Sequence, residues 1–238
     1  MPLIYSPISE ELVSNPPRKL RPRSAFVMRQ IGLPPHIDQQ MDTVVREVLV
    51  DNGFDYIDAT TTAGGKDFLE RIIDLIRSTG LTIAIFSHET RSSALANIML
   101  ELGFAAIFGK PLLIVKSKDA VAPSDLTRTD WIEFQNGNLD AFRQKIIQTV
   151  GELSDIANYQ EMLLDIALDA PEMDCAVAFE RAQKAFLLEP SVALLDKIVV
   201  IKQRVMDCRN IDQMSDLHRL HDEISAFFKQ ASAYFQAN

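Results

Sequence analysis

Apolar residues between positions 24 and 150 follow two alternating patterns. Short continuous apolar runs are typical of strands that are buried on both faces, whereas apolar positions that recur every three or four residues are typical of helices. The runs predict strands at 25–28, 54–57, 81–86, 111–115 and 131–134. The periodic stretches predict helices at 36–50, 68–76, 93–108 and 139–150. Strands separated by helices in this way indicate a parallel sheet with helices on both faces.

Beyond residue 150 the pattern is helical throughout. Candidate helices cover 154–168, 175–188, 192–208 and 211–235, and Pro171 and Pro190 mark breaks between them. Residues 1–150 hold 16 Lys and Arg against 18 Asp and Glu, a net charge of −2, whereas residues 151–238 hold 8 against 15, a net charge of −7. We therefore predict an α/β domain at 24–150 and an acidic all-α helical bundle at 151–238.

The first 23 residues are predicted to form an extended arm. Five of the eleven prolines lie there, and proline removes backbone donors and disfavours helix in the residue before it. A short basic run accompanies them, formed by Arg18, Lys19, Arg21 and Arg23. We interpret this run as a solvated linker, and a contact to an anionic partner is the alternative.

Composition narrows the class of protein. The chain has 238 residues, 47% of them apolar, which is ample for a buried core, and no apolar run approaches the roughly 20 residues that cross a bilayer. The first residues lack the basic and apolar regions of a secretory signal, and the two cysteines, Cys175 and Cys208, are expected to be free thiols. A cytoplasmic protein without membrane contact is expected. The net charge of −9 argues against direct nucleic-acid binding.

The segments that follow the predicted strands are the places to search for a site, because ligands bind beyond the carboxyl ends of parallel strands. The segment 94–109 is the most informative, since Glu101 is its only ionisable residue in an otherwise apolar helix. Asn97 and Ser93 precede Glu101 at intervals of four residues and share its face. A desolvated carboxyl group there should have a raised pKa. The alternative is a structural carboxylate held by a backbone donor or an arginine.

The run from Asn97 to Val115, NIMLELGFAAIFGKPLLIV, resembles the signature of the nucleoside 2-deoxyribosyltransferase-like and bacterial TIR-like group. Members typically show an Asn-x-x-x-Glu-Leu-Gly-x-Ala helix followed by Gly-Lys-Pro and a strand. The likeness covers residues 24–134 and implies a flavodoxin-like, parallel-sheet fold. It implies that Glu101 attacks the anomeric carbon of a nucleoside or nucleotide, or stabilises the ribosyl cation. It also implies that Arg29 and Gln30 hold base or phosphate.

Two positions depart from the pattern of that group. The usual acidic residue after the third strand is replaced by Ser87 and His88, and the Asn-Pro expected before the helix's second asparagine reads Leu95-Ala96. Substrate identity is therefore open, and Ser87 and His88 are candidate substrate contacts, together with Ser93 and Asn97.

The residues are consistent with N-glycosidic chemistry even without the resemblance. Cleavage of an N-glycosidic bond passes through an oxocarbenium-like transition state, which a fixed carboxylate stabilises or traps. A second group must protonate the leaving base or donate a hydrogen bond to it. Asp58 is the first candidate and Asp67 the second, and a turn-forming aspartate is the alternative for Asp58. Arg29 is suited to a phosphate, with a surface arginine as its alternative.

We therefore predict cleavage or transfer at the N-glycosidic bond of a nucleoside, nucleotide or NAD, in a role such as bacterial antiviral defence. No cofactor and no metal are expected, because His218 and His221 lack further ligands. The acidic helical module is expected to mediate homo-oligomerisation or to bind a protein partner. A non-catalytic nucleotide-binding or scaffold protein that retains the fold is the competing hypothesis.

Overall fold

The computed structural model of the chain describes residues 4–5, 12–13, 19–61, 68–121, 131–170, 174–207 and 214–237. The chain divides into two compact units. One comprises residues 23–153, here called the α/β unit, and the other comprises residues 1–22 and 154–238, here called the helical unit. Each unit has its own apolar core.

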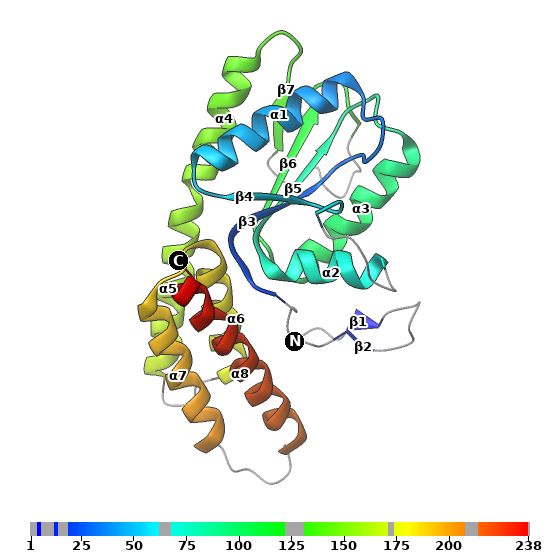
Figure 1. Cartoon of the computed structure of the whole chain (residues 1–238). Coiled ribbons are helices and arrows are strands. Elements are labelled where there is room, and N and C mark those ends of the chain that lie inside the picture. The colour runs from blue at the N-terminus through cyan, green and yellow to red at the C-terminus, as the bar shows by residue number, and fades with distance from the viewer. Residues whose placement is uncertain are drawn as a thin grey trace. The chain divides into compact units, whose positions relative to one another are not determined.

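The α/β unit is built on a five-stranded parallel sheet (Figure 1), as the alternating patterns predict. Its strands are β3 (Arg21–Met28), β4 (Asp55–Asp58), β5 (Thr79–Phe86), β6 (Leu112–Ser117) and β7 (Trp131–Phe134). They lie in the order β4-β3-β5-β6-β7. The central strand β5 is buried along its whole length, which explains why its sequence is a continuous apolar run.

Helices cover both faces of this sheet (Figure 1). They are α1 (His36–Asp51), α2 (Phe68–Ser78), α3 (Ser92–Ile107) and α4 (Leu139–Gly151). α2 and α3 share one apolar cluster with β3, β5 and β6. α1 and α4 contact each other on the opposite face, where Phe142 of α4 packs edge-to-face against Phe134 of β7 at 5.1 Å. The two layers leave the carboxyl ends of the strands free to carry polar residues.

The first strand of this sheet begins within the segment that the prolines assign to an extended arm. β3 starts at Arg21, and Pro22 is tolerated because it lies at the beginning of the strand. Arg23 has a left-handed backbone (φ 54°), and its guanidinium donates to the carbonyl oxygens of Asn52 and Gly53 at the end of α1. Arg23 therefore does not belong to a solvated linker. Nearer the N-terminus, β1 (Ile4–Tyr5) pairs antiparallel with β2 (Leu12–Val13).

The helical unit contains α5 (Leu153–Asp169), α6 (Cys175–Leu188), α7 (Val192–Asp207) and α8 (Met214–Ala237). Residues of all four helices contribute to one apolar core, in which the ring of Phe227 packs edge-to-face against Phe179 and Phe186. The Asp174 side chain caps α6 by accepting hydrogen bonds from two backbone N–H groups. Lys197 of α7 forms ion pairs with Glu161 and Asp165 of α5. The helical pattern of the sequence is therefore confirmed for the described part of this unit.

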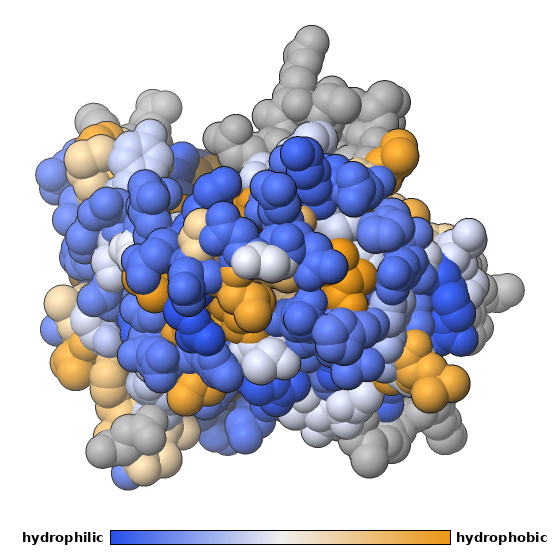
Figure 2. All heavy atoms as spheres, turned by 90° about the horizontal axis from the view of Figure 1, so that it is seen from above, coloured by the Kyte–Doolittle hydropathy of each residue, from blue (hydrophilic) through white to orange (hydrophobic). Residues whose placement is uncertain are grey.

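The face shown in Figure 2 is mostly hydrophilic, with separate hydrophobic residues among the polar ones. Within the described residues, no helix combines the length and the apolar composition needed to cross a membrane.

Candidate functional site

The order of the strands reverses between β3 and β5, because the chain moves from β3 outward to β4 and then returns past β3 to β5. Ligands of open α/β sheets bind at such a point, outside the carboxyl ends of the strands. Arg29 and Gln30 follow β3, whereas Ser87 and His88 follow β5. The structure therefore brings these four predicted residues to one edge of the sheet.

Arg29 lies in a closed polar network. Its Nη2 donates to Oδ2 of Asp58 at 2.8 Å, its Nε donates to the hydroxyl of Tyr56 at 2.8 Å, and its Nη1 lies 3.4 Å from the carbonyl oxygen of Gln30. The Tyr56 hydroxyl in turn donates to Asp42 of α1. All three guanidinium nitrogens of Arg29 thus have partners, and its side chain is only 19% exposed. This network joins β3, β4 and α1.

Asp58 is held in its ionised form. Burial alone raises the pKa of a carboxyl group, but hydrogen bonds from Thr60 and the ion pair with Arg29 outweigh burial and lower the pKa of Asp58. Its Oδ1 also accepts from the backbone N–H of Thr60, the geometry of an Asx turn. An ionised, fully paired aspartate is a poor proton donor at neutral pH, so the contacts of Asp58 match the turn-forming alternative more closely than an acid catalyst.

Gln30 connects the loops after β3 and β5. Its side chain is buried, its Oε1 accepts from the backbone N–H of Arg91, and its Nε2 donates to the carbonyl oxygen of Leu33. The Arg91 guanidinium donates back to the carbonyl oxygens of Ile31 and Gly32. Leu33 has a left-handed backbone (φ 49°), which these contacts hold in place. Both polar atoms of the Gln30 amide therefore take part in positioning this loop.

Ser87 and His88 lie in a turn, and hydrogen bonds that lead to a buried carboxylate hold this turn in place. The backbone N–H of Ser87 donates to Oγ1 of Thr90, and that hydroxyl donates to Oδ2 of Asp38 at 2.8 Å. Asp38 is 2% exposed, and the Ser87 hydroxyl also interacts favourably with its carboxylate, although no described donor meets full hydrogen-bond geometry at Oδ1. Burial raises the pKa of Asp38. The His88 backbone N–H donates to Oγ of Ser117 at 3.2 Å, which fixes the turn to β6.

The predicted residues on α3 lie on the other face of the sheet. α3 begins at Ser92, and Ser93 and Asn97 are exposed in its first two turns. Glu101 follows Ser92 by nine residues, which at 1.5 Å per residue places it about 14 Å along the helix from the carboxyl edge. It is partly buried and has no hydrogen bond or ion pair to any residue that the structure describes.

Burial raises the pKa of Glu101 to about 7, since no described cation or donor offsets the loss of water. Near neutral pH the ionised and the protonated forms of Glu101 are therefore both populated. Catalytic carboxyl groups often have such a raised pKa, because acid–base and nucleophilic roles require a pKa close to the working pH. Glu101 is the predicted residue whose electrostatics agree best with a chemical role.

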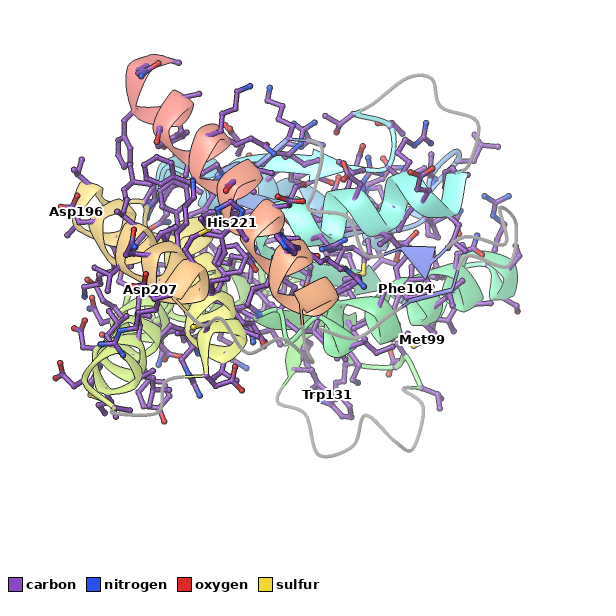
Figure 3. The ribbon with its side chains drawn as sticks, turned by 90° about the horizontal axis from the view of Figure 1, so that it is seen from below. Met99, Phe104, Trp131, Asp196, Asp207 and His221 are labelled. Atoms are coloured by element: carbon purple, nitrogen blue, oxygen red, sulfur yellow. The ribbon has the colours of Figure 1, made fainter. Side chains whose placement is uncertain are left out.

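A buried lysine lies on the same face of the sheet as α3. Lys116, at the end of β6, is 4% exposed, and its Nζ donates to Glu133 at 2.9 Å and lies 5.0 Å from the centre of the Trp131 ring. Trp131 packs against the cluster that α3 also joins, as do Met99 and Phe104 (Figure 3). The ion pair with Lys116 lowers the pKa of Glu133.

A cavity of about 460 Å³ opens at the carboxyl edge on the face that α1 covers. It is bounded by the start of α1, the turn after β5, the end of β6 with the turn that follows it, and the end of β7. Its lining residues are His36, Ile37, Gln40, His88, Glu89, Ser117, Lys118, Asp119, Phe134, Gln135 and Asn136. Of the predicted site residues only His88 is among them.

The structure therefore separates the predicted site into three places. Arg29 and Asp58 pair with each other, Ser87 and His88 border or line the cavity, and Glu101 lies on α3. Asp67 and the Gly-Gly-Lys run at 64–66 lie outside the described residues. Asp38 and Lys116 were missed because each looks ordinary in sequence, an acidic residue in the first turn of a helix and a lysine at a strand end.

Among the described residues no three His, Cys, Asp or Glu side chains are grouped so that they could hold a metal ion. Comparison of the chain with protein-family models, with curated proteins and with solved structures finds no match.

Proposed function

We propose that the α/β unit is a nucleotide-processing domain that cleaves or transfers at the N-glycosidic bond of a nucleoside, nucleotide or NAD, with Glu101 as its reacting carboxylate. The observation that carries this proposal is the electrostatic state of Glu101, which is partly buried, unpaired among described residues and close to a pKa of 7. Such a group can stabilise or trap an oxocarbenium ion when it is ionised.

The strand order supports the finer fold assignment in this proposal. Numbered within the sheet, the order β4-β3-β5-β6-β7 reads 2-1-3-4-5, which is the flavodoxin-like order. Together with the Asn-x-x-x-Glu-Leu-Gly run on α3, this order favours a TIR-like or deoxyribosyltransferase-like domain. By the same resemblance we propose a role in bacterial antiviral defence, in which loss of a nucleotide pool stops the host cell.

We propose further that the helical unit serves assembly or binds a protein partner. Phe227 is committed to the core of this unit and is 1% exposed, so it is not available as a contact surface. The large apolar residues left exposed on α7 are Val192, Val199, Val200 and Met206, each at least 44% exposed. Static light scattering of the full chain and of a Val192→Glu/Val199→Glu variant tests this part. A smaller assembly in the variant supports it, and equal masses contradict it.

A non-catalytic nucleotide-binding protein is the second candidate, and one observation favours it. The predicted proton donor Asp58 is ion-paired with Arg29 and has a lowered pKa, so the described residues around it supply no acid for the leaving base. A chain that retains the fold without its acid would bind nucleotides and leave them intact.

One experiment separates the two candidates. The full chain is incubated with a mixed pool of nucleosides, nucleotides and NAD, and released bases are measured by chromatography. The first candidate requires base release by the natural chain, its loss in Glu101→Gln, and its retention in the matched control Glu152→Gln, where Glu152 is an exposed residue at the end of α4. Binding without base release in all three proteins would support the second candidate instead.

A further inference from the structure

α5 has apolar residues on two opposite faces. One face belongs to the core of the helical unit, where Leu164 is buried and Ala167 and Leu168 pack against the same cluster. The other face is exposed, and its large apolar side chains are Ile156 at 37%, Tyr159 at 54%, Met162 at 50% and Ile166 at 61% exposure. A surface helix of a folded domain needs one apolar stripe for its core, so packing within the helical unit does not explain the second.

The exposed residues are spaced as in a helix that packs against another helix. Ile156, Tyr159, Leu163 and Ile166 follow one another at intervals of three, four and three residues, which is the repeat of paired helices. They cover about 15 Å along the helix at 1.5 Å per residue. Tyrosine is common where binding energy is concentrated, and methionine adapts to the shape of a partner. We call these four residues and Met162 the α5 stripe.

The charge around the α5 stripe is acidic. Residues 152–170 contain five Asp and Glu and no Lys, Arg or His. The cations of neighbouring helices that contact α5 are Arg181, Lys197 and Arg204. The carboxylates at or next to the ends of α5 are exposed and form no ion pair with any described residue; they are Glu152, Asp155 and Asp169. Negative charge is therefore in excess around the stripe, above all near its two ends.

This charge determines which kind of partner the stripe fits. Pairing with α5 of a second copy would bring Asp155 of one copy close to Asp169 of the other when the helices are antiparallel, and close to its own counterpart when they are parallel. Like charges in such positions disfavour a complex. An anionic membrane surface is disfavoured as well, because helices that lie on it are rich in Lys and Arg. A helix with its own apolar stripe and basic flanks meets neither penalty.

We propose that the α5 stripe is the docking site for a basic amphipathic helix of another protein. Apolar side chains of that helix cover Tyr159, Met162 and Ile166, and its Lys or Arg side chains lie near Asp155 and Asp169. This inference rests on the partner-binding alternative of the function proposed for the helical unit, and it is independent of the chemistry of Glu101.

Fluorescence anisotropy of a labelled synthetic peptide, measured with the full chain, tests this proposal. The probe is a helix-forming peptide of about 18 residues with leucine at the heptad a and d positions and lysine beside them, and the matched peptide carries glutamate in place of lysine. The lysine peptide should bind saturably, and the glutamate peptide should bind at least tenfold more weakly. Raising the salt concentration from about 0.05 to 0.5 M should weaken binding of the lysine peptide.

Apolar variants locate the surface to which the peptide binds. Tyr159→Gln/Ile166→Gln should weaken binding of the lysine peptide by roughly tenfold or more, because it removes apolar area from the stripe without adding charge. Val192→Gln/Val199→Gln, which replaces exposed apolar residues of α7, is the matched control and should bind the peptide as the natural chain does. All four residues are exposed, so circular dichroism should show unchanged helix content in both variants.

Charge variants test the basic character of the partner. Asp155→Asn/Asp169→Asn should weaken binding of the lysine peptide by about threefold or more, since it removes the unpaired carboxylates of α5. Asp196→Asn/Asp222→Asn makes the same change in net charge with exposed residues of α7 and α8, and it should alter the affinity by less than about twofold.

The same measurements contain the results that overturn the proposal. Absence of saturable binding by the lysine peptide would refute it, as would equal affinities of the two peptides or equal effects of the α5 and α7 variants. A lower mass of Tyr159→Gln/Ile166→Gln in static light scattering would show that a second copy covers the stripe instead. If the lysine peptide does not bind but the full chain assembles through its α7 valines, the function proposed for the helical unit stands and only this inference is refuted.

Discussion

Replacing Glu101 by Gln should stabilise the α/β unit at neutral and alkaline pH. The pKa of Glu101 is about 7 in the folded chain and 4.5 as the ordinary value. Between these two pH values the folded state binds a proton that the unfolded state has released. Stability therefore falls as the pH rises from 4.5 to 7, and it stays reduced above 7. The glutamine side chain has nearly the same shape but carries no charge, so the Glu101→Gln variant does not lose stability in this way.

The magnitude follows from the difference of 2.5 between the two pKa values. At 1.36 kcal/mol per unit the charged form of Glu101 costs up to about 3 kcal/mol, and partial exposure of the side chain reduces this to about 2–3 kcal/mol. Glu101→Gln should accordingly raise the free energy of unfolding by about 2–3 kcal/mol at pH 8. At pH 5 the gain should be below about 1 kcal/mol, because Glu101 is then protonated in the folded state.

Urea denaturation followed by tryptophan fluorescence measures this difference in the free energy of unfolding, and it reports on the α/β unit. Trp131 is the single tryptophan of the chain, and it packs against the apolar cluster that contains α3. The exposed Glu152→Gln serves as the control and should change little at either pH. An equal gain at pH 5 and pH 8, or a loss of stability in Glu101→Gln at pH 8, would refute the reasoning that burial without a partner sets the state of Glu101.

Three further predictions concern the ion pairs of the sheet. Arg29→Ala should lower the free energy of unfolding by about 3 kcal/mol, because it leaves the buried Asp58 carboxylate without its cation. Urea denaturation at pH 7 measures this loss, and a loss below about 1 kcal/mol would contradict the importance of the pair. Because the pKa of Asp58 is lowered in the folded chain, its contribution is present at neutral pH and lost as the pH falls below about 4, so Asp58→Asn should flatten the acid limb of a stability profile. Glu133→Gln should destabilise the chain more than Lys116→Met, since only the former leaves the buried Lys116 ammonium without its carboxylate, and the reverse order of melting temperatures would contradict this.

The strands and helices of the α/β unit could be predicted because their apolar patterns are strong. The continuous runs at 81–86 and 131–134 became β5 and β7, with ends that moved by no more than two residues. The start of β3 could not be predicted, because Pro22 and the charged Arg21 and Arg23 are unusual in a strand. Arg23 is accommodated there by its hydrogen bonds to the end of α1 and by its contact with the ring of Phe54, both some 30 residues away along the chain.

The candidate site was predictable in part for the same physical reason. Glu101 is noticeable as the lone charge of an apolar helix, and its burial follows from that setting. The partner of Arg29 was not predictable, because Asp58 lies 29 residues further on and reaches Arg29 through the parallel register that sets Val27 beside Asp58. The burial of Asp38 could not be predicted, because it depends on how α1 packs against the turn after β5, which the local sequence does not encode.

The pH dependence of base release tests the central claim most directly. With the substrate that the mixed pool identifies, the rate of base release by the natural chain should rise with pH through a midpoint near 7, because only the ionised Glu101 carboxylate can stabilise or trap the ribosyl cation. Glu101→Gln should show no such limb and little release at any pH. A rate that is flat between pH 5 and 8, or equal release by the natural chain and Glu101→Gln, would contradict the assignment of Glu101 as the reacting group.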